Sequence, residues 1–377
     1  MSAVKIMFHG LLILMGIHTA IYLVVTQDFE ARQNVVEYHA SRVFYFLNTP
    51  GVKQGIEQIP KIQSMEGPVR PDFWSYASLL DSLSGKQASF PEIVDQLKTI
   101  IVVYKNTLEN YDLHQIDLQG SALENANFKS ADLNHANFQD AVLSQANLNG
   151  ANLSKTNLKN ADLARADLSG ANFRNSRLIG ADLSGTNLSQ TDFSGATIKD
   201  TKFAQATFSN TNFSKVDLSG SDFNQMDLNN VIMMETNLRG ADFSRVNLQK
   251  SDLSQSDLRK INLFAANLEQ SRLVEVNLDE GDLRGAKLAG ADLSEADLYK
   301  ANLSGADLSG SNLTGANFSG ADLNGTTLYN AKINEVENLS CEQIEAAILD
   351  RKTTEFPDYI TLSWTSEEAF TCKSSLG

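Results

Sequence analysis

The amino-acid sequence predicts an all-β solenoid flanked by helical segments. From Leu113 to Ile333 every fifth residue is Leu, Phe, Ile or Met, which makes 45 consecutive pentads. An α-helix would spread residues five apart around its axis, and a straight strand would send them to opposite faces. A small residue usually lies two positions before each large one, and glycine is frequent between these pairs. The chain must therefore turn once per pentad, with the small and the large residue both facing inward.

The repeat resembles that of the pentapeptide repeat family, whose motif reads A(D/N)Lxx. Ala161–Leu163 and Ala321–Leu323 both read ADL and match the motif outright. The resemblance covers roughly residues 111–335, and we take residues 110–335 as the repeat domain. It implies a right-handed quadrilateral β-helix with four pentads per coil, so that 45 pentads form about eleven coils.

Residues twenty apart should stack on one side of such a β-helix. We therefore expect two interior phenylalanine ladders, formed by Phe173, Phe193 and Phe213 and by Phe203, Phe223 and Phe243. In the same stretch the small residues change to Thr201, Thr211, Val216, Met226 and Val231. This stretch is the least regular part of the predicted rod.

The first feature of the chain is apolar, because the twenty residues from Ile6 to Val25 carry no formal charge. Twenty helical residues span ~30 Å, the thickness of a hydrocarbon core. We expect residues 1–27 to be an uncleaved transmembrane signal anchor that contacts the membrane through residues 6–25; a cleaved signal peptide is the competing interpretation. Lys5 precedes the span, and two acidic residues follow it. This favours a single-pass protein of the cell membrane, with a cytoplasmic N-terminus and an extracytoplasmic (periplasmic) rod.

Residues 28–109 are expected to form a helical spacer and the N-terminal cap of the rod. Residues 48–71 contain four prolines and several glycines, which favours a connector. From Pro91 to Leu108, apolar residues lie at helical spacing and lead directly into the first pentad. A solenoid end exposes apolar side chains and unpaired strand edges. This helix is therefore the predicted cap.

Residues 336–377 are expected to form a C-terminal cap and tail. Ser340 followed by Gln343 is a capping-box pattern that opens a helix from Cys341 to Leu349. The tail beyond it is expected to pack over the end of the rod as an irregular segment. Cys341 and Cys372 are the two cysteines of the chain. A disulfide between them is one interpretation, and two unrelated buried thiols are the other.

Catalytic chemistry has little support in the sequence. Of 28 acidic residues between positions 111 and 335, eighteen are Asp in the outward slot just before the large apolar residue. There Asp alternates with Asn, which indicates a structural role. No phosphate-binding loop, nucleophile motif or metal-ligand spacing appears. We therefore expect a protein that is not an enzyme and has neither a cofactor nor a metal site.

Apolar residues in outward or corner positions break the pattern of the rod. They are the candidates for a partner surface, with Ile232 and Phe264 the first choices, followed by Ile179 and Tyr299. Single exposed apolar residues are common on proteins. These four positions are therefore interpreted as candidates and no more.

Three functions are compatible with the sequence. The first is a membrane-anchored scaffold that binds an unidentified protein partner. The second follows from the resemblance, because some pentapeptide repeat proteins are dimeric acidic rods that mimic DNA and bind DNA gyrase. The third is a membrane sensor or accessory subunit that acts through residues 28–109. Outside the repeated Asp slot the rod has ten acidic and nineteen basic residues, a poor charge mimic of a phosphate backbone. The first function is favoured, with no nucleic acid partner; a homo-oligomer also fits the sequence.

Overall fold

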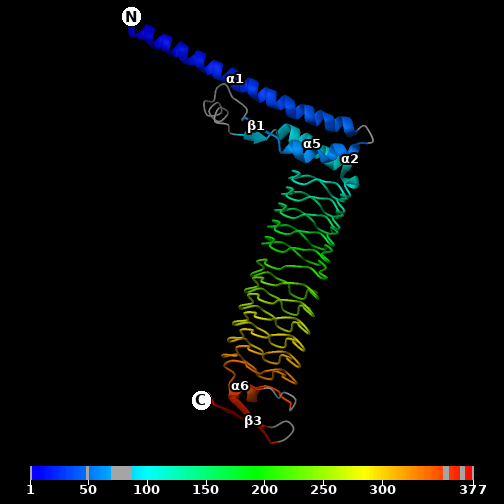
Figure 1. The fold of residues 1–377 in the computed structure, drawn as a ribbon, viewed down its shortest axis with the longest axis vertical. Helices are drawn as coiled ribbons and strands as arrows, with labels where there is room; N and C mark the ends of the chain where they lie inside the picture. Colours follow the sequence, from blue (N-terminus) through cyan, green and yellow to red (C-terminus); the bar gives the residue numbers. More distant parts are fainter. Residues whose placement is uncertain are drawn as a thin grey trace.

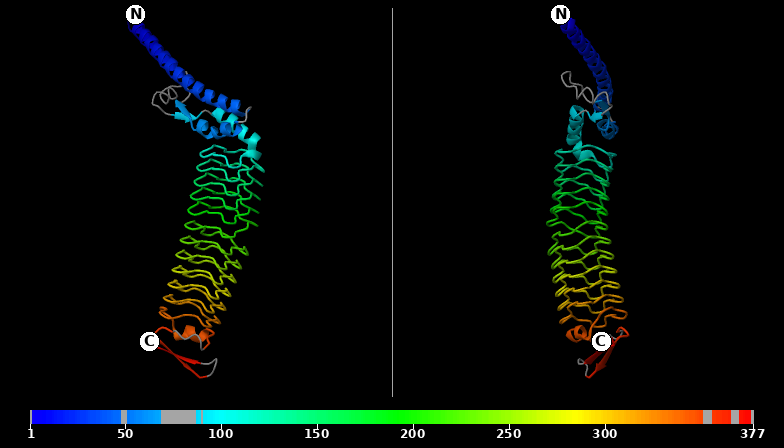
Figure 2. Two further views of the ribbon diagram at one scale, coloured as in Figure 1. Left: turned by 45° about the vertical axis from the view of Figure 1, so that its right-hand side comes forward. Right: turned by 90° about the vertical axis from the view of Figure 1, so that its left-hand side faces the viewer.

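A long rod occupies the centre of the computed structural model, with a helical assembly at its N-terminal end and a small cap at its C-terminal end (Figure 1). The structure describes residues 2–47, 51–68, 87–89, 91–350, 356–365 and 370–375. The termini of the chain lie at opposite ends of the rod, which Figure 2 shows from two further directions.

The rod is a β-helix in which residues twenty apart pair as parallel neighbours. The pairs run from Asp112–Asp132 to Asn317–Glu337. Each pentad forms one side of a coil, and four pentads complete it. We number the sides 1 to 4, beginning with residues 111–115, 116–120, 121–125 and 126–130. The predicted four-pentad coil and the solenoid architecture are therefore observed.

Three backbone hydrogen bonds per pentad join neighbouring coils. In one regular pentad, Leu283 N–H donates to the carbonyl oxygen of Asn302 at 2.7 Å and Gly285 N–H to that of Ser304 at 3.0 Å. Asp282 N–H donates in the opposite direction, to Ile261 at 2.9 Å. Because each N–H finds a carbonyl one coil away, the short extended segments need no long strands to satisfy their backbone.

The interior of the rod is a continuous apolar core. Large residues such as Leu283 and Leu303 have no exposed surface. Both predicted phenylalanine ladders are confirmed. In the first, the ring centroids are 4.9 and 5.2 Å apart, and in the second 5.7 and 4.9 Å. The 5.7 Å step, between Phe203 and Phe223, is the widest of the four.

The corners of the coils explain where glycine occurs. The last residue of each pentad adopts a left-handed conformation, for example Gly315 with φ 72° and Lys300 with φ 51°. L-residues tolerate this conformation singly at a cost that glycine avoids. At Gly315 a Cβ atom would lie 2.6 Å from Oε1 of Glu295. The Glu295 carboxylate can swing aside, so it is the backbone conformation that favours glycine there.

The N-terminal assembly contains α1 (Ser2–Leu47), α2 (Val52–Glu57), α3 (Ile59–Gln63), β1 (Glu66–Pro68), β2 (Gln87–Ser89), α5 (Pro91–Tyr104) and the 3-10 helix η1 (Lys105–Thr107). β1 and β2 pair antiparallel. α2 and α3 lie within the predicted connector, which is therefore wrong as a description of residues 52–63. A proline is no obstacle to α3, because Pro60 occupies its first turn, where no intrahelical N–H bond is required.

Side chains of this assembly satisfy the edge of the first coil. Gln63 donates from Nε2 to the carbonyl oxygen of Asp117 and accepts from Asp117 N–H through Oε1, both at 2.8 Å. Asn127 N–H donates to the carbonyl oxygen of Lys105 at 2.7 Å. The strand edge that a solenoid end would leave open is thus paired by α3 and by the helical segment before the rod.

The predicted membrane anchor requires a correction. Residues 6–25 form the first part of α1, a single helix of 46 residues that runs on through charged residues to Leu47. In the part of the chain that the structure describes, no helix combines the length and the apolar character that crossing a membrane demands. Such a crossing takes about 20 predominantly apolar residues. The predicted single-pass topology, with its cytoplasmic N-terminus and periplasmic rod, is therefore wrong.

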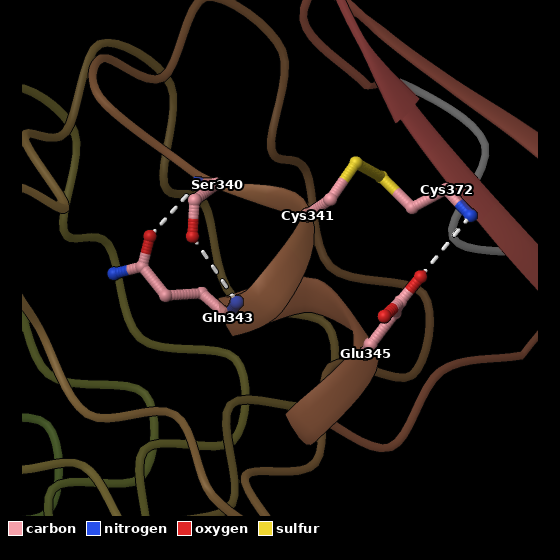
Figure 3. The surroundings of a disulfide bond; sticks show 5 residues. All are labelled: Ser340, Cys341, Gln343, Glu345 and Cys372. Carbon is pink, nitrogen blue, oxygen red and sulfur yellow. Dashed lines mark hydrogen bonds between the residues drawn. A yellow bond between two sulfur atoms is a disulfide. The ribbon is translucent and has the colours of Figure 1, made fainter. Parts of the chain in front are cut away.

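The C-terminal cap consists of α6 (Cys341–Ala346) and the antiparallel pair β3 (Ile360–Trp364) and β4 (Phe370–Ser374). The predicted capping box is present: Ser340 Oγ accepts from Gln343 N–H at 3.2 Å, and Ser340 N–H donates to Gln343 Oε1 at 2.8 Å (Figure 3). α6 is three residues shorter than predicted. The tail is a hairpin where an irregular segment was expected.

A disulfide joins the two parts of this cap. Cys341 at the start of α6 is bonded to Cys372 in β4, with Cα atoms 5.5 Å apart (Figure 3). Tyr359, just before β3, donates its hydroxyl hydrogen to the carbonyl oxygen of Val336 at 2.9 Å. These two links attach the hairpin to α6 and to the end of the rod.

Candidate partner-binding surface

The outward Asp and Asn side chains of the rod are occupied by structural hydrogen bonds. Asp242 Oδ1 accepts from Ser244 N–H and from Asn262 Nδ2, both at 2.9 Å. The first bond closes the corner of the same pentad, and the second reaches the next coil. The same two-residue contact recurs along the rod, for example from Ser304 N–H to Asn302 Oδ1 at 3.0 Å. These carboxylates and amides therefore build the corners.

The four candidate surface residues do not form one patch. Ile232 lies on side 1 and is 39% exposed, whereas Phe264 lies at a corner of side 3 and is 37% exposed. Ile179 and Tyr299 share the corner column of side 2 but are six coils apart. Tyr299 is 37% exposed, and Ile179 is partly buried. The structure thus separates the candidates into three sides.

Phe264 has the most elaborate surroundings of the four. The guanidinium carbons of Arg245 and Arg284 lie 5.8 and 5.6 Å from the centroid of its ring. Arg284 is held by Asp282, because its Nε and Nη2 donate to the two carboxylate oxygens at 2.8 and 2.7 Å. The side-chain hydrogen bond from Arg284 lowers the pKa of Asp282. Phe264 is therefore an exposed aromatic ring between two cations, one of them fixed.

A cleft in the middle of the rod is a feature that sequence reasoning missed. The coil of residues 191–210, which we call the interrupted coil, is bridged to the next coil only on side 1, between Asp192 and Asn212. On sides 2, 3 and 4, Thr197, Lys202 and Thr207 are bridged to the coil above. The bridges expected from them to the coil below are absent in this stretch, which the structure describes in full. A cleft of about 1080 Å³ opens between residues 195–204 and 215–226.

The sequence of the interrupted coil accounts for this opening. In three consecutive outward slots, Thr197, Lys202 and Thr207 replace the Asp or Asn whose side chain closes a corner. Met226 fills a slot that holds Ala206 one coil above and Val246 one coil below. A larger side chain in a closely packed column forces its neighbours apart. The irregularity of this stretch was visible in the sequence, but the separation of the coils was not.

The histidines and acidic residues of the rod form no metal-binding group in the described part of the chain. His114 and Asp112 form an exposed pair, with Nδ1 and Oδ1 2.6 Å apart. This side-chain hydrogen bond raises the pKa of His114 and lowers that of Asp112. His135 contacts Asn134. Both histidines lie on the surface of the first coils and carry no catalytic arrangement.

Comparison with known families decides the identity of the rod. The model for pentapeptide repeats matches residues 112–210 and 277–336 in overlapping copies, and the model for a pentapeptide repeat region matches residues 206–283. Together these matches cover residues 112–336 without a gap, more than half of the chain. The chain belongs to the pentapeptide repeat family. The family identified from the A(D/N)Lxx motif is thereby confirmed.

Solved structures of other pentapeptide repeat proteins resemble this one. HetL from the cyanobacterium Nostoc, described as involved in the regulation of heterocyst differentiation, is 29% identical over 62% of this chain and 96% of its own, with a TM-score of 0.42. A protein of the Arabidopsis thaliana thylakoid lumen is 31% identical over 30% of this chain and 71% of its own, with a TM-score of 0.21.

A third solved structure is that of QnrB1, described as a plasmid-mediated fluoroquinolone resistance protein. It is 21% identical over 52% of this chain and 92% of its own, with a TM-score of 0.32. No curated protein matches this pentapeptide repeat protein. The function therefore has to be argued from its own residues.

Proposed function

We propose that this pentapeptide repeat protein is a non-enzymatic scaffold that binds a protein partner on the side of its rod. The observation that carries the proposal is Phe264, an exposed ring between Arg245 and Arg284. Aromatic and arginine side chains provide most of the binding energy in many protein interfaces. Most of the surrounding outward positions hold Asp and Asn side chains that are already engaged in corner hydrogen bonds. The Phe264 cluster is therefore the most suitable anchor on side 3.

The hydrogen bonds of the outward carboxylates argue against mimicry of DNA. A phosphate backbone offers its oxygens to cationic side chains of a partner. Asp242 and Asp282 instead direct oxygens to backbone N–H groups, to Asn262 and to Arg284. Carboxylates engaged in this way are poorly placed to stand in for phosphates. Binding to DNA gyrase is accordingly not the function that we propose.

A second candidate function is that of a sensor or accessory subunit that acts through residues 28–109. It is favoured by a pocket of about 270 Å³ between α1, α2 and α3. Its lining includes the basic side chains of His39, Arg42 and Lys61 and the apolar side chains of Val43 and Ile62. A small organic anion with an apolar part would suit this lining. Isothermal titration calorimetry with short-chain fatty acids tests binding of such an anion in this pocket. Heat of binding that persists unchanged in the Arg42→Gln variant would contradict this second candidate function.

Site-specific photo-cross-linking tests the scaffold proposal. A benzophenone amino acid is placed at Phe264 or, as a matched control, at Tyr329, which is 44% exposed on side 4. In producing cells, position 264 should give a discrete cross-linked product and position 329 none. Phe264→Ala should lower recovery of that partner at least tenfold without changing the thermal midpoint. Equal cross-linking at both positions would rule out the Phe264 cluster as the anchor.

A further inference from the structure

We infer that the cleft beside the interrupted coil binds an extended segment of a partner polypeptide, which pairs through its backbone with both lips. The upper lip is residues 195–210 of the interrupted coil, and the lower lip is residues 215–229 of the coil below it. This site lies apart from the Phe264 cluster and involves different side chains. It rests on the proposed scaffold function only in taking a polypeptide as the partner.

Both lips carry backbone groups that regular coils use for pairing. One coil above, Leu178 N–H donates to the carbonyl oxygen of Thr197 at 2.8 Å, and Gly180 N–H to that of Lys199 at 3.0 Å. The corresponding donors one coil below are Ile198 and Asp200, and neither has a backbone acceptor in this fully described stretch. The same holds on side 3 for Phe203. The upper lip is therefore an unpaired strand edge.

The lower lip offers the complementary groups. In a regular coil, Asn237 N–H donates to the carbonyl oxygen of Val216 at 3.0 Å. Asp217 and Asp222, which hold the same position on the lower lip, donate to no backbone carbonyl in this fully described stretch. Their carbonyl oxygens also lack the N–H groups of Ile198 and Phe203. A strand placed between the lips could pair with one lip along each of its edges, which is how extended peptides add to sheet edges.

The floor of the cleft is apolar and accessible. Thr201, Ala206 and Met226 occupy inward slots that are almost fully buried in regular coils, yet here all three are partly exposed. Behind them, the rings of Phe203 and Phe223 remain in contact, with centroids 5.7 Å apart. Alternate side chains of a bound strand would face this floor. The floor therefore favours a segment with apolar residues at every second position.

The charges of the lips favour a polypeptide over a polyanion. The cleft is lined by three lysines and three aspartates, which sum to no net charge: Lys199, Lys202, Lys215, Asp200, Asp217 and Asp222. On sides 2 and 3, the lysines belong to the upper lip and Asp217 and Asp222 to the lower one. A nucleic acid would meet repulsion from Asp217 and Asp222 and would find no net positive charge in the cleft. A segment of mixed charge meets complementary groups on both lips.

Insertion of a strand requires the lips to separate further. A strand between two others needs two interstrand spacings, about 9.6 Å. The intact pair Asp192–Asn212 on side 1 keeps the coils joined, so that sides 2 to 4 can open about it. Met226 hinders closure of the two lips, because its side chain is larger than those of Ala206 in the coil above and Val246 in the coil below. The site is thus an opening that the rod cannot fill with its own backbone.

Peptide binding to a closed variant tests this inference. The probe is a fluorescein-labelled peptide with the sequence of residues 358–365, in which Ile360, Leu362 and Trp364 alternate with Thr361, Ser363 and Thr365. The closed variant combines Thr197→Asn, Lys202→Asn, Thr207→Asn and Met226→Ala, which restores the regular residue types. The control variant combines Arg177→Asn with Lys287→Asn, two outward slots in regular coils.

The full-length protein and the control variant should bind the probe saturably in fluorescence anisotropy, and the closed variant at least tenfold more weakly. The same peptide with alternate backbone nitrogens methylated lacks the N–H groups that would pair with a lip, and should also bind at least tenfold more weakly. This second comparison uses the unmodified protein. Spin labels at Gln205 and Gln225, on opposite lips, should move apart when the probe binds. Labels at Gln255 and Glu275 in a regular stretch should not.

Absence of saturable binding to the full-length protein would overturn the inference. Equal affinity of the closed variant or of the methylated peptide would overturn it as well, because either result would place recognition outside the lips. Phe264→Ala should leave probe binding unchanged. Loss of the partner cross-link at Phe264 together with retained probe binding would refute the scaffold anchor alone, and the reverse result would refute the cleft alone.

Discussion

Asp192 and Asn212 form the one backbone bridge that holds the interrupted coil to the coil below it. Phe193 N–H donates to the carbonyl oxygen of Asn212 at 2.7 Å, and Asn212 N–H to that of Thr191 at 2.9 Å. The other three sides lack such bonds. A solenoid whose coils otherwise pair on all four sides therefore has one joint that is held on a single side.

Amide hydrogen exchange should reveal this joint. We expect the amides of Ile198, Asp200 and Phe203 to exchange much faster than those of Leu278, Glu280 and Leu283 in a regular coil, because an exposed or unpaired N–H lacks protection. Phe193 and Asn212 should remain protected. Mass spectrometry of deuterated peptides, or NMR, makes the comparison. Uniform protection along the rod would mean that the coils are closed in solution.

The outward Asp slot should contribute stability through acceptance of hydrogen bonds. Asp242→Ala removes the acceptor of two bonds, so we expect the free energy of unfolding to fall by about 1–2 kcal/mol. Asp242→Asn keeps an oxygen at the same place and should cost much less. Urea denaturation followed by circular dichroism measures both. Equal losses in the two variants would indicate that the negative charge matters and the acceptor does not.

Loss of the Cys341–Cys372 disulfide should destabilise the C-terminal cap. The bond closes a segment with a sequence separation of 31 residues, and removal of such a crosslink costs roughly 2–4 kcal/mol. Because coils interact only with their neighbours, the effect should be confined to α6, the hairpin and the last coils. Hydrogen exchange of Cys341→Ser/Cys372→Ser would show it. Faster exchange near residue 150 would contradict this local account.

The pair of His114 and Asp112 should make a pH-dependent contribution at the first coil. The side-chain hydrogen bond raises the pKa of His114 above its usual value of about 6.5. The stabilising contribution is then fully present below pH ~6.5 and is lost as pH rises through the raised value. NMR titration of the His114 ring should give a pKa that falls in Asp112→Asn. An unchanged pKa would show that the pair does not form in solution.

The sequence predicted the rod because its rule is local and repeated. Each large residue of the pentad points inward, and each coil contacts only the coils beside it. With the four pentads per coil that the family resemblance implies, stacking of Phe173 on Phe193 follows from their spacing. The capping box of Ser340 and Gln343 was readable for the same reason, since it depends on two residues three apart.

Contacts between distant segments could not be predicted in this way. Gln63 pairs with the backbone of Asp117 across 54 positions of the chain, and no periodicity relates them. The hairpin of β3 and β4 was missed because each strand is only five residues long, although the apolar and polar residues of Ile360–Trp364 alternate. The apolar run of residues 6–25 was interpreted by composition as a membrane span, which the structure of the described residues does not support.

The candidate partner-binding surface was likewise predicted in part from local sequence and in part decided by contacts between coils. The sequence identified Phe264 as an exception to the pattern, but the two arginines beside it come from neighbouring coils, and Asp282 fixes one of them. The sequence also marked the stretch around Met226 as irregular. Whether an irregular residue packs within the column or separates the coils depends on how its side chain packs against those of the residues twenty positions before and after it.

The resemblance to the pentapeptide repeat family implied the four-sided coil and, with it, the phenylalanine ladders. The sequence by itself determined the pentad, its inward-facing residues and the structural role of the outward Asp. These follow from spacing and from the need to satisfy each backbone group near its own position. Only the tertiary structure decided that Thr197, Lys202, Thr207 and Met226 together open a cleft, and that Asp192 and Asn212 keep its lips joined. The physical reason is that coil separation is set by packing between coils, which no single pentad specifies.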